Sequence, residues 1–477
     1  MELGLTANDW LLAAPFLWLA GAGVLVLIWD AVRPQPLAEG IVSWIGLGLA
    51  AVACLPILEA VRTEPVEAFS GMLSVNVPVI VLAILCLGAA AFCGIVAWRS
   101  LLPYEGGRHT TAFWTLLLFS TFGMVLTLWA NHMATLFLGV ECLSLPLYVL
   151  VALRRDQSDS IEAGLKYFLL GAFASGFMAF GMAMVYAATG DMSPAAISAA
   201  AEGSSLGVFG VALLLIALLF KVAAVPFHLW VADVYQGAPT PVTALMATGT
   251  KAATVAALLR WAPGGELMGP QSWAMLGCLT LLIGNLTALN QSNLKRMLAL
   301  SGVAHVGILL FAFAARAAAE TAEATSQIGD TLGYYLVAYG LAATAAFGAL
   351  ELLERRVGHS ESASLQGIAR RQPLLAGVLC IALLSLAGFP LTAGFLAKYF
   401  VFVEMIRHGL SSWAVIGILL TLFGFAYYLK ALVTLFMQEP PEERPSLWRP
   451  DWVATMALLV PTVLSVVFGV WPKAIQL

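Results

Sequence analysis

The sequence has 477 residues, of which 61% are hydrophobic and only 10% are charged. Soluble domains carry about 25% charged residues, so this composition excludes a soluble enzyme, a nucleic-acid-binding module and a disulfide scaffold. The net charge of −4 is too small to indicate an anionic partner. The long apolar runs do not alternate with polar residues, which favours membrane-spanning helices over a barrel. We therefore expect an all-α polytopic membrane protein.

Segments of about 20 apolar residues are long enough to cross a bilayer as helices. The first segment follows Glu2 and Asp9 without a basic stretch, so we expect it to be a retained span and not a signal peptide. About fourteen spans are predicted, near residues 10–30, 41–61, 75–97, 112–130, 133–153, 161–188, 206–230, 241–260, 273–290, 297–315, 331–353, 373–403, 411–436 and 453–471.

Basic residues outside the spans predict the orientation of the chain. Connections after odd-numbered spans contain Arg33, Arg99, Arg108, Arg154, Arg155, Lys295, Arg296, Arg355, Arg356, Arg370, Arg371, Arg444 and Arg449. The opposite side contains Arg62, Arg260, Arg316, Arg407 and Lys473. Short cytoplasmic loops carry an excess of Lys and Arg. The first side is therefore expected to be cytoplasmic, and both termini are expected to face outward.

Lysines, in contrast to arginines, occur inside the predicted spans. Of the seven lysines, five lie there: Lys166, Lys221, Lys251, Lys398 and Lys430. A charged lysine at mid-bilayer costs about 2.5–3.5 kcal/mol on insertion scales. A buried lysine can gain and lose a proton, whereas an arginine stays charged. These lysines are therefore candidates for proton transfer within the membrane.

Glu141 is the one carboxylate near the middle of an apolar predicted helix. A glutamate about 4 Å from a lysine stabilises the charged pair by roughly 4 kcal/mol at an effective dielectric constant of 20. Forming or breaking such a pair would switch a lysine between holding and releasing its proton.

Proline and glycine predict that two of the lysine-bearing spans are interrupted. Pro226 and His228 follow Lys221 in the seventh span, and Gly388-Phe389-Pro390 precede Lys398 in the twelfth. Proline lacks the backbone donor and clashes with the preceding turn. Interrupted helices can admit water beside an ionisable group, as in transporters.

The spacing of these interrupted spans predicts two inverted five-helix repeats. In spans 4–8 and in spans 9–13 the interrupted, lysine-bearing helix is the fourth, and five is an odd number of crossings. The predicted organisation is a three-helix segment over 1–111, repeats over 112–262 and 263–440, and a final span within 441–477.

Several of these residues have a second interpretation. Lys430 is close to the expected cytoplasmic end of its span and could snorkel to the interface. Lys166 could be a boundary charge that pairs with Glu162 one turn earlier. His305 is either a relay group or a satisfied packing histidine.

No signature of a cofactor or metal site is present in the sequence. The six cysteines lie in apolar stretches without metal-ligand spacing, and neither a phosphate-binding loop nor a dinucleotide fingerprint occurs. We expect no cofactor and no metal in this chain. Any redox chemistry would belong to another polypeptide.

Five motifs together resemble the antiporter-like membrane subunits of respiratory complex I, the bacterial NADH:quinone oxidoreductase. They are Glu141 in GVECLSLPLYVL, Lys221 in LLFKVAAVPFHLW, Lys251 at the end of DVYQGAPTPVTALMATGTK, His305 in NLKRMLALSGVAHVG and Lys398 in GFPLTAGFLAKYF. The resemblance covers spans 4–13. Within the family it is greatest to the subunit N branch, which the additional Lys166 in IEAGLKYFLLGAFASGF also suits.

The resemblance implies a proton-pumping role driven by quinone reduction in other subunits, in a bacterial inner membrane with both termini periplasmic. It implies that Glu141 pairs with Lys221, that Lys251 and His305 are central, and that Lys398 is the exit-side group. Lys166 and His228 are additional candidates. The implied partners are subunit M, small membrane subunits, lipid, and subunits that hold flavin, iron–sulfur clusters and the quinone site. The alternatives are a cation/proton antiporter subunit of the same fold and a structural subunit without its own channel.

Overall fold

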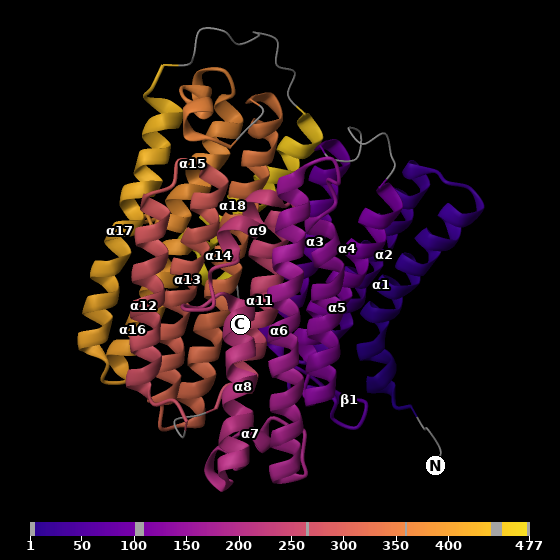
Figure 1. Ribbon diagram of the computed structural model, residues 1–477, viewed down its shortest axis with the longest axis vertical. Helices are drawn as coiled ribbons and strands as arrows, with labels where there is room; N and C mark the ends of the chain where they lie inside the picture. The colour runs from indigo at the N-terminus through magenta and orange to yellow at the C-terminus, as the bar shows by residue number, and fades with distance from the viewer. Residues whose placement is uncertain (1–4, 101–108, 264–266, 358–359, 440–450, 475–477) are drawn as a thin grey trace.

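The structure is a computed structural model that describes residues 5–100, 109–263, 267–357, 360–439 and 451–474. Its helices run side by side along the long axis of the molecule (Figure 1). Among the described residues, 13 helices are long and apolar enough to cross a membrane, and a helix pair bent by 116° brings the number to as many as 14. The expected all-α polytopic membrane fold is confirmed.

The first half of the described chain contains eight helices and a small hairpin. These elements are α1 (Ala7–Val32), α2 (Pro36–Ala60), β1 (Val66–Ala68), β2 (Leu73–Val75), α3 (Val77–Ser100), α4 (Thr110–Trp129), α5 (Met133–Val151), α6 (Ser158–Thr189), α7 (Ala195–Gly203) and α8 (Ser205–Val222).

The second half continues with α9 (Val231–Gly237), α10 (Thr240–Leu245), the π-helical turn η1 (Met246–Thr250), α11 (Lys251–Trp261), α12 (Pro270–Leu289), α13 (Leu294–Ala317) and α14 (Ala322–Val357). After the 3-10 turns η2 (Ser362–Leu365) and η3 (Ile368–Arg370) come α15 (Pro373–Ala387), α16 (Ala393–Arg407), α17 (Ser411–Phe436), α18 (Trp452–Val470) and the 3-10 turn η4 (Pro472–Ala474).

Helices α13 and α14 form the centre of the bundle. Their apolar windows are wholly buried inside the chain, whereas those of α2, α17 and α18 are only one-third buried. Small residues allow α12 to approach α13 closely, because a Cβ on Gly284 would meet the backbone of Ala304 at 2.5 Å. The outer helices expose apolar side chains such as Leu17 and Phe173, as expected for contact with lipid or partner subunits.

The helix ends near Lys221 and Lys398 coincide with the glycine and proline positions in the sequence. Helix α8 ends at Val222, and helical structure resumes at Val231 after a segment containing Pro226. Helix α15 ends at Ala387, where Gly388 adopts a left-handed φ of 87°, and α16 begins at Ala393. The predicted span over 206–230 is therefore helical only as far as Val222, and the predicted span over 373–403 contains two helices, α15 and α16.

Two small elements were not predicted from the sequence. Strands β1 and β2 pair in antiparallel register through a turn in which Phe69, Ser70 and Gly71 all have positive φ. The Asp9 carboxylate at the start of α1 accepts from the Phe69 backbone N–H. Strands of three residues are too short to show a periodic pattern, and the nine-residue α7 is likewise too short to span a membrane.

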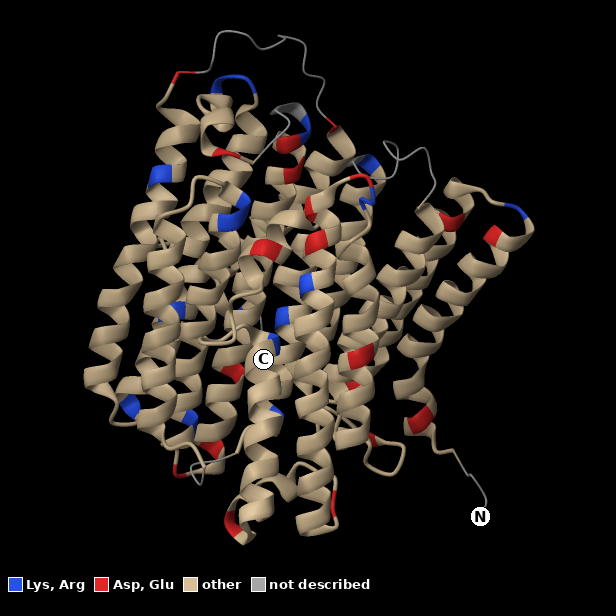
Figure 2. Ribbon diagram, viewed as in Figure 1, with Lys and Arg blue, Asp and Glu red and all other residues tan. Residues whose placement is uncertain are grey.

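Charged residues gather at the two ends of the bundle, with a sparse set at mid-height (Figure 2). Of the basic residues used to predict orientation, Arg108, Arg444 and Arg449 lie outside the described residues, as does the predicted boundary at 440–441. The inverted repeats and the other domain boundaries stay predictions.

Candidate functional site

Lys221 is buried near the carboxyl end of α8 and faces α5. Its Nζ donates to the Ser144 hydroxyl at 2.8 Å and to the Tyr148 hydroxyl at 3.4 Å. Both acceptors lie on α5, one turn apart, so they present one face to the lysine. Gly171 on α6 leaves room for Tyr148, because a Cβ there would collide with the Tyr148 hydroxyl. This lysine is thus held by two neutral hydroxyl groups.

Glu141 lies on the same helix, one turn before Ser144, and is half-buried. Its carboxylate accepts a hydrogen bond from the Ser175 hydroxyl of α6. Among the ion pairs of the described residues, none joins Glu141 to Lys221. The structure therefore places the two residues on facing helices with Ser144 as the direct partner of the lysine.

Lys251 is the first residue of α11 and follows the π-helical turn η1. Its Nζ donates to the Gly302 carbonyl of α13 at 2.7 Å and to the Tyr339 hydroxyl of α14 at 3.3 Å. A Cβ on Gly302 would lie 2.9 Å from the Lys251 Nζ and 2.9 Å from the Tyr339 hydroxyl, so a larger residue would displace one of these groups. Isolated π-helical turns are frequent at functional sites because they redirect side chains.

His305 is buried on α13 and continues this cluster of polar groups. Its Nδ1 lies 2.7 Å from the Tyr335 hydroxyl, and its Nε2 lies 3.4 Å from the Tyr428 hydroxyl of α17. The ring centroid of His305 is 4.9 Å from that of Tyr339. Tyr339 therefore contacts both Lys251 and His305, and the cluster extends over α11, α13, α14 and α17.

Lys398 of α16 is part-buried at the break between α15 and α16. Its Nζ donates to the carbonyls of Leu386 and Ala387 at 2.9 and 2.7 Å. These are the last carbonyls of α15, which lack partners within the helix and carry its negative dipole end. Gly388 lies against the lysine side chain, because a Cβ there would be 3.2 Å from Nζ. The early end of α15 thus provides the acceptors for the ammonium group.

Lys166 lies apart from these lysines in an ion-pair network between α6, α9 and α13. It pairs with Glu162 at 2.7 Å and with Asp233 at 2.8 Å, and Arg296 pairs with the same aspartate at 2.6 Å. The Lys166 side chain is 41% exposed. Hydrogen bonds from Lys166 and Arg296 hold the pKa of the Asp233 carboxyl below its ordinary value. The pairing of Lys166 with Glu162 matches the boundary-charge interpretation.

The remaining candidates are separate from the lysine contacts. His228 is buried in the segment between α8 and α9, and its Nδ1 has no hydrogen-bond partner among the described residues. Lys430 is exposed on α17.

Sequence reasoning missed Lys295, which was assigned to a connecting loop. It is the second residue of α13, only 4% exposed, and donates to the Ala238 carbonyl at 2.5 Å. Because Lys295 is next to Arg296, the two residues were interpreted as a solvent-exposed basic pair. The tyrosine partners of Lys221, Lys251 and His305 were also missed, because tyrosine in an apolar helix usually indicates packing.

Comparison with known proteins identifies the family. Residues 130–424 match the family described as NADH:quinone oxidoreductase/Mrp antiporter, transmembrane. The chain belongs to this family. The matched region contains every lysine and histidine contact described above except the 3.4 Å contact of His305 with Tyr428.

Relatives indicate the branch of the family. The chain is 37% identical to NADH-quinone oxidoreductase subunit N of Salinibacter ruber, over 94% of this chain and 91% of that protein. It is 40% identical to the subunit N of Acidothermus cellulolyticus, over 78% of this chain and 72% of that protein. The resemblance to the subunit N branch is thereby confirmed.

Solved structures support the same fold. A chain of respiratory complex I from Thermus thermophilus superposes with a TM-score of 0.80 at 34% identity, covering 96% of this chain and 97% of that one. A chain of the Mrp complex from Dietzia has a TM-score of 0.86 at 21% identity, covering 98% and 96%. At this lower identity the second likeness shows the fold alone.

Proposed function

We propose that this chain is a proton-translocating membrane subunit of an NADH-quinone oxidoreductase in a bacterial inner membrane. Its subunit N relatives and the complex I neighbour support the assembly. The observation that carries proton transfer is a set of three lysines inside the bundle, the buried Lys221 and Lys251 and the part-buried Lys398, each held by neutral oxygen atoms. Such a lysine can lose its proton without leaving a buried carboxylate unpaired.

The proposed direction is from the cytoplasm to the periplasm. A proton loads Lys221, and a change at Glu141, driven by neighbouring subunits, favours its release. The proton then passes through Lys251, water and the His305 cluster to Lys398. Both termini face the periplasm in this arrangement. The redox groups and the quinone site belong to other subunits of the complex.

The test uses the intact complex reconstituted into liposomes, with NADH oxidation and proton uptake measured together. Lys221→Ala and Glu141→Ala are expected to lower the number of protons moved per electron while the complex remains assembled. Lys430→Ala is the matched control, because this lysine also lies in a span but is exposed on α17. Normal pumping by an assembled Lys221→Ala complex would place the relay elsewhere.

The second candidate is a subunit of a cation/proton antiporter complex, which the fold shared with the Dietzia Mrp chain favours. Purification with native partners separates the two, because flavin and iron–sulfur proteins accompany only the oxidoreductase. A purely structural subunit is the third candidate, and pumping that survives neutral replacement of all buried lysines would support it.

A further inference from the structure

A cavity of about 550 Å³ opens at the end of the bundle that carries the β1–β2 hairpin. Its walls come from the segments flanking the hairpin, from α3, from α11 and from both sides of the α13–α14 connection. None of the lysines of the proposed relay lines it. The start of α1 is tied to the same hairpin through Asp9 and Phe69, so the cavity lies on the face of the N-terminus.

The cavity extends from this face toward Lys251. Its inner wall includes Val255 of α11 and Leu336 of α14. Val255 is four residues after Lys251, and Leu336 is three residues before Tyr339, whose hydroxyl contacts the Lys251 Nζ at 3.3 Å. At a rise of about 1.5 Å per residue, each helix separates the inner wall from the lysine contact by about one turn.

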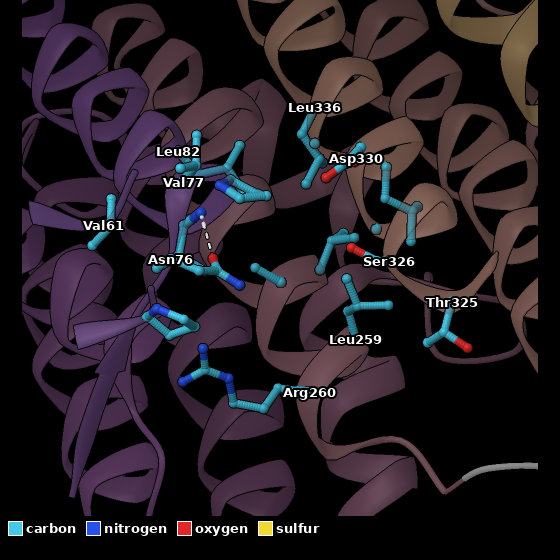
Figure 3. Close-up of a pocket in the computed structure, with 18 of the residues that line it drawn as sticks. Val61, Asn76, Val77, Leu82, Leu259, Arg260, Thr325, Ser326, Asp330 and Leu336 are labelled. Carbon is cyan, nitrogen blue, oxygen red and sulfur yellow. Dashed lines mark hydrogen bonds between the residues drawn. The ribbon is translucent and has the colours of Figure 1, made fainter. Parts of the chain in front are cut away.

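Asp330 provides a part-buried carboxylate within this cavity. Figure 3 shows it on the same side as Leu336, with Ser326 between it and Thr325, and with Arg260 at the opposite end of the view. Among the described residues, no hydrogen bond or ion pair of the Asp330 carboxylate is found. Its oxygen atoms are therefore available to water in the cavity.

Arg260 has a different role, because its guanidinium is already engaged. It donates to the backbone carbonyls of Ser74, Trp129 and Ala130 at 3.0–3.3 Å. These bonds fix the hairpin and the end of α4 at the rim of the cavity. The opening is thus a built feature, held by the hydrogen bonds of a half-buried arginine.

The polar groups within a mostly apolar lining, together with the size of the cavity, favour water as its occupant. A water molecule takes about 30 Å³ and needs two to four polar partners. The carboxylate of Asp330, the amide of Asn76 and the hydroxyl of Ser326 line the space and meet this need. Purely apolar cavities stay dry, and this one is not purely apolar.

We propose that this cavity is an aqueous vestibule through which a proton from Lys251 reaches the N-terminal face, with Asp330 as its release group. This inference rests on the proposed function and adds a release route at Lys251 beside the one at Lys398. An N–H bond of the Lys251 ammonium breaks and the proton passes through water to the Asp330 carboxylate. The carboxylic acid then gives the proton to bulk water, so the chain returns to its starting charge.

Cysteine labelling tests the vestibule independently of pumping. In the intact complex, Gly329→Cys and Val255→Cys place thiols in the outer and inner parts of the cavity. A Cβ on Gly329 meets no atom within 4 Å, and cysteine is close in size to valine. The unsubstituted complex provides the labelling background, because the native Cys142, Cys278 and Cys380 are only half-buried. A membrane-impermeant maleimide added from the N-terminal face is expected to label both variants.

The inner position decides the result. Leu336→Cys is a second inner variant. If Gly329→Cys is labelled but neither Val255→Cys nor Leu336→Cys is, the cavity does not reach the lysine and the proposal is overturned. Failure to label any of the three variants would overturn it as well.

Pumping measurements test the release group. Asp330→Asn is expected to produce at least half of the loss in protons per electron that Lys251→Ala produces, and Asp330→Glu is expected to retain pumping. Glu323→Gln is the matched control, because this acid is exposed at the start of the same helix and outside the cavity. If Lys251→Ala lowers pumping and Asp330→Asn does not, the release route is wrong and the relay stands. If Lys251→Ala pumps normally, both are wrong.

Discussion

The hydrogen bond between Lys221 and Ser144 provides a direct test of how the buried lysine is held. Ser144→Ala removes the nearer acceptor, at 2.8 Å, and leaves only the Tyr148 hydroxyl at 3.4 Å. A hydrogen bond to a charged group contributes about 1.5–3 kcal/mol. At about 1.4 kcal/mol per tenfold change, the loss corresponds to roughly a 10- to 150-fold less favourable loading of Lys221.

The assay is proton uptake and NADH oxidation by the reconstituted complex at saturating substrate. We expect Ser144→Ala to reduce coupled proton movement through this chain about tenfold or more, while assembly is unchanged. Ser144→Thr keeps the hydroxyl and is expected to retain most of the pumping. Ser160→Ala is the matched control, because Ser160 is equally buried but bonds only to the Val151 carbonyl of a helix end.

If Ser144→Ala pumps within about twofold of the native complex, the serine does not hold the charged lysine during turnover. Equal losses in Ser144→Ala and Ser160→Ala would mean that a buried serine matters only for packing.

Three further predictions concern stability and the α15–α16 break. Gly123→Ala is expected to lower the thermal unfolding temperature, because its Cβ would collide with the backbone of Leu143 and overpacking destabilises a fold by about 1–3 kcal/mol. Gly48→Ala is the control and should leave this temperature unchanged, because a Cβ there meets open space. Asp233→Asn should lower the free energy of unfolding by about 1 kcal/mol or less, because the ion pairs of Asp233 are partly exposed. Unfolding measured at several pH values checks this. Hydrogen bonds from Lys166 and Arg296 lower the Asp233 pKa, so the contribution of Asp233 to the free energy of unfolding is present above the unfolded-state pKa of about 3.9. This contribution is lost as the pH falls through the folded-state pKa, so the stabilities of native protein and variant should converge in acid. Gly388→Ala should lower the free energy of unfolding by about 1–2 kcal/mol, because alanine is strained at the positive φ of this position. It should also impair pumping, because its Cβ would press on the Lys398 side chain, and a pumping assay at a temperature where the variant stays folded checks this.

The membrane class and the main buried charges could be predicted from the sequence because both follow from composition along single helices. A span needs only an apolar run, and a lysine within such a run is visible without a partner. Lys221, Lys251 and Lys398 were predicted in this way, and the structure shows each of them with polar partners.

The partners could not be predicted because they depend on which helices touch. Tyr339 meets Lys251 only because α14 packs beside α11, and no feature of the tyrosine's own segment indicates this. The vestibule is a stronger example, since its lining comes from positions between 61 and 336. The burial of Lys295 could not be predicted for the same reason. A Lys-Arg pair is typical of a loop, and the sequence does not indicate that Lys295 packs inside the bundle.

The neutral partners of the three lysines suggest why this fold uses lysine without fixed counter-ions. A lysine paired with a buried carboxylate would leave an uncompensated anion when it lost its proton, at a cost of about 3–5 kcal/mol. Serine and tyrosine hydroxyl groups can accept from the ammonium and donate to the neutral amine, so both states at Lys221 and Lys251 can be hydrogen-bonded. The carbonyls of Leu386 and Ala387 can only accept, and they lie at a helix end with a partial negative charge. The acceptors at Lys398 therefore differ in kind from those at Lys221 and Lys251, because they cannot donate to a neutral amine. In the proposed relay, release of a proton from Lys398 would therefore need these carbonyls to move away from the amine, and the α15–α16 break is where Gly388 permits the backbone to turn.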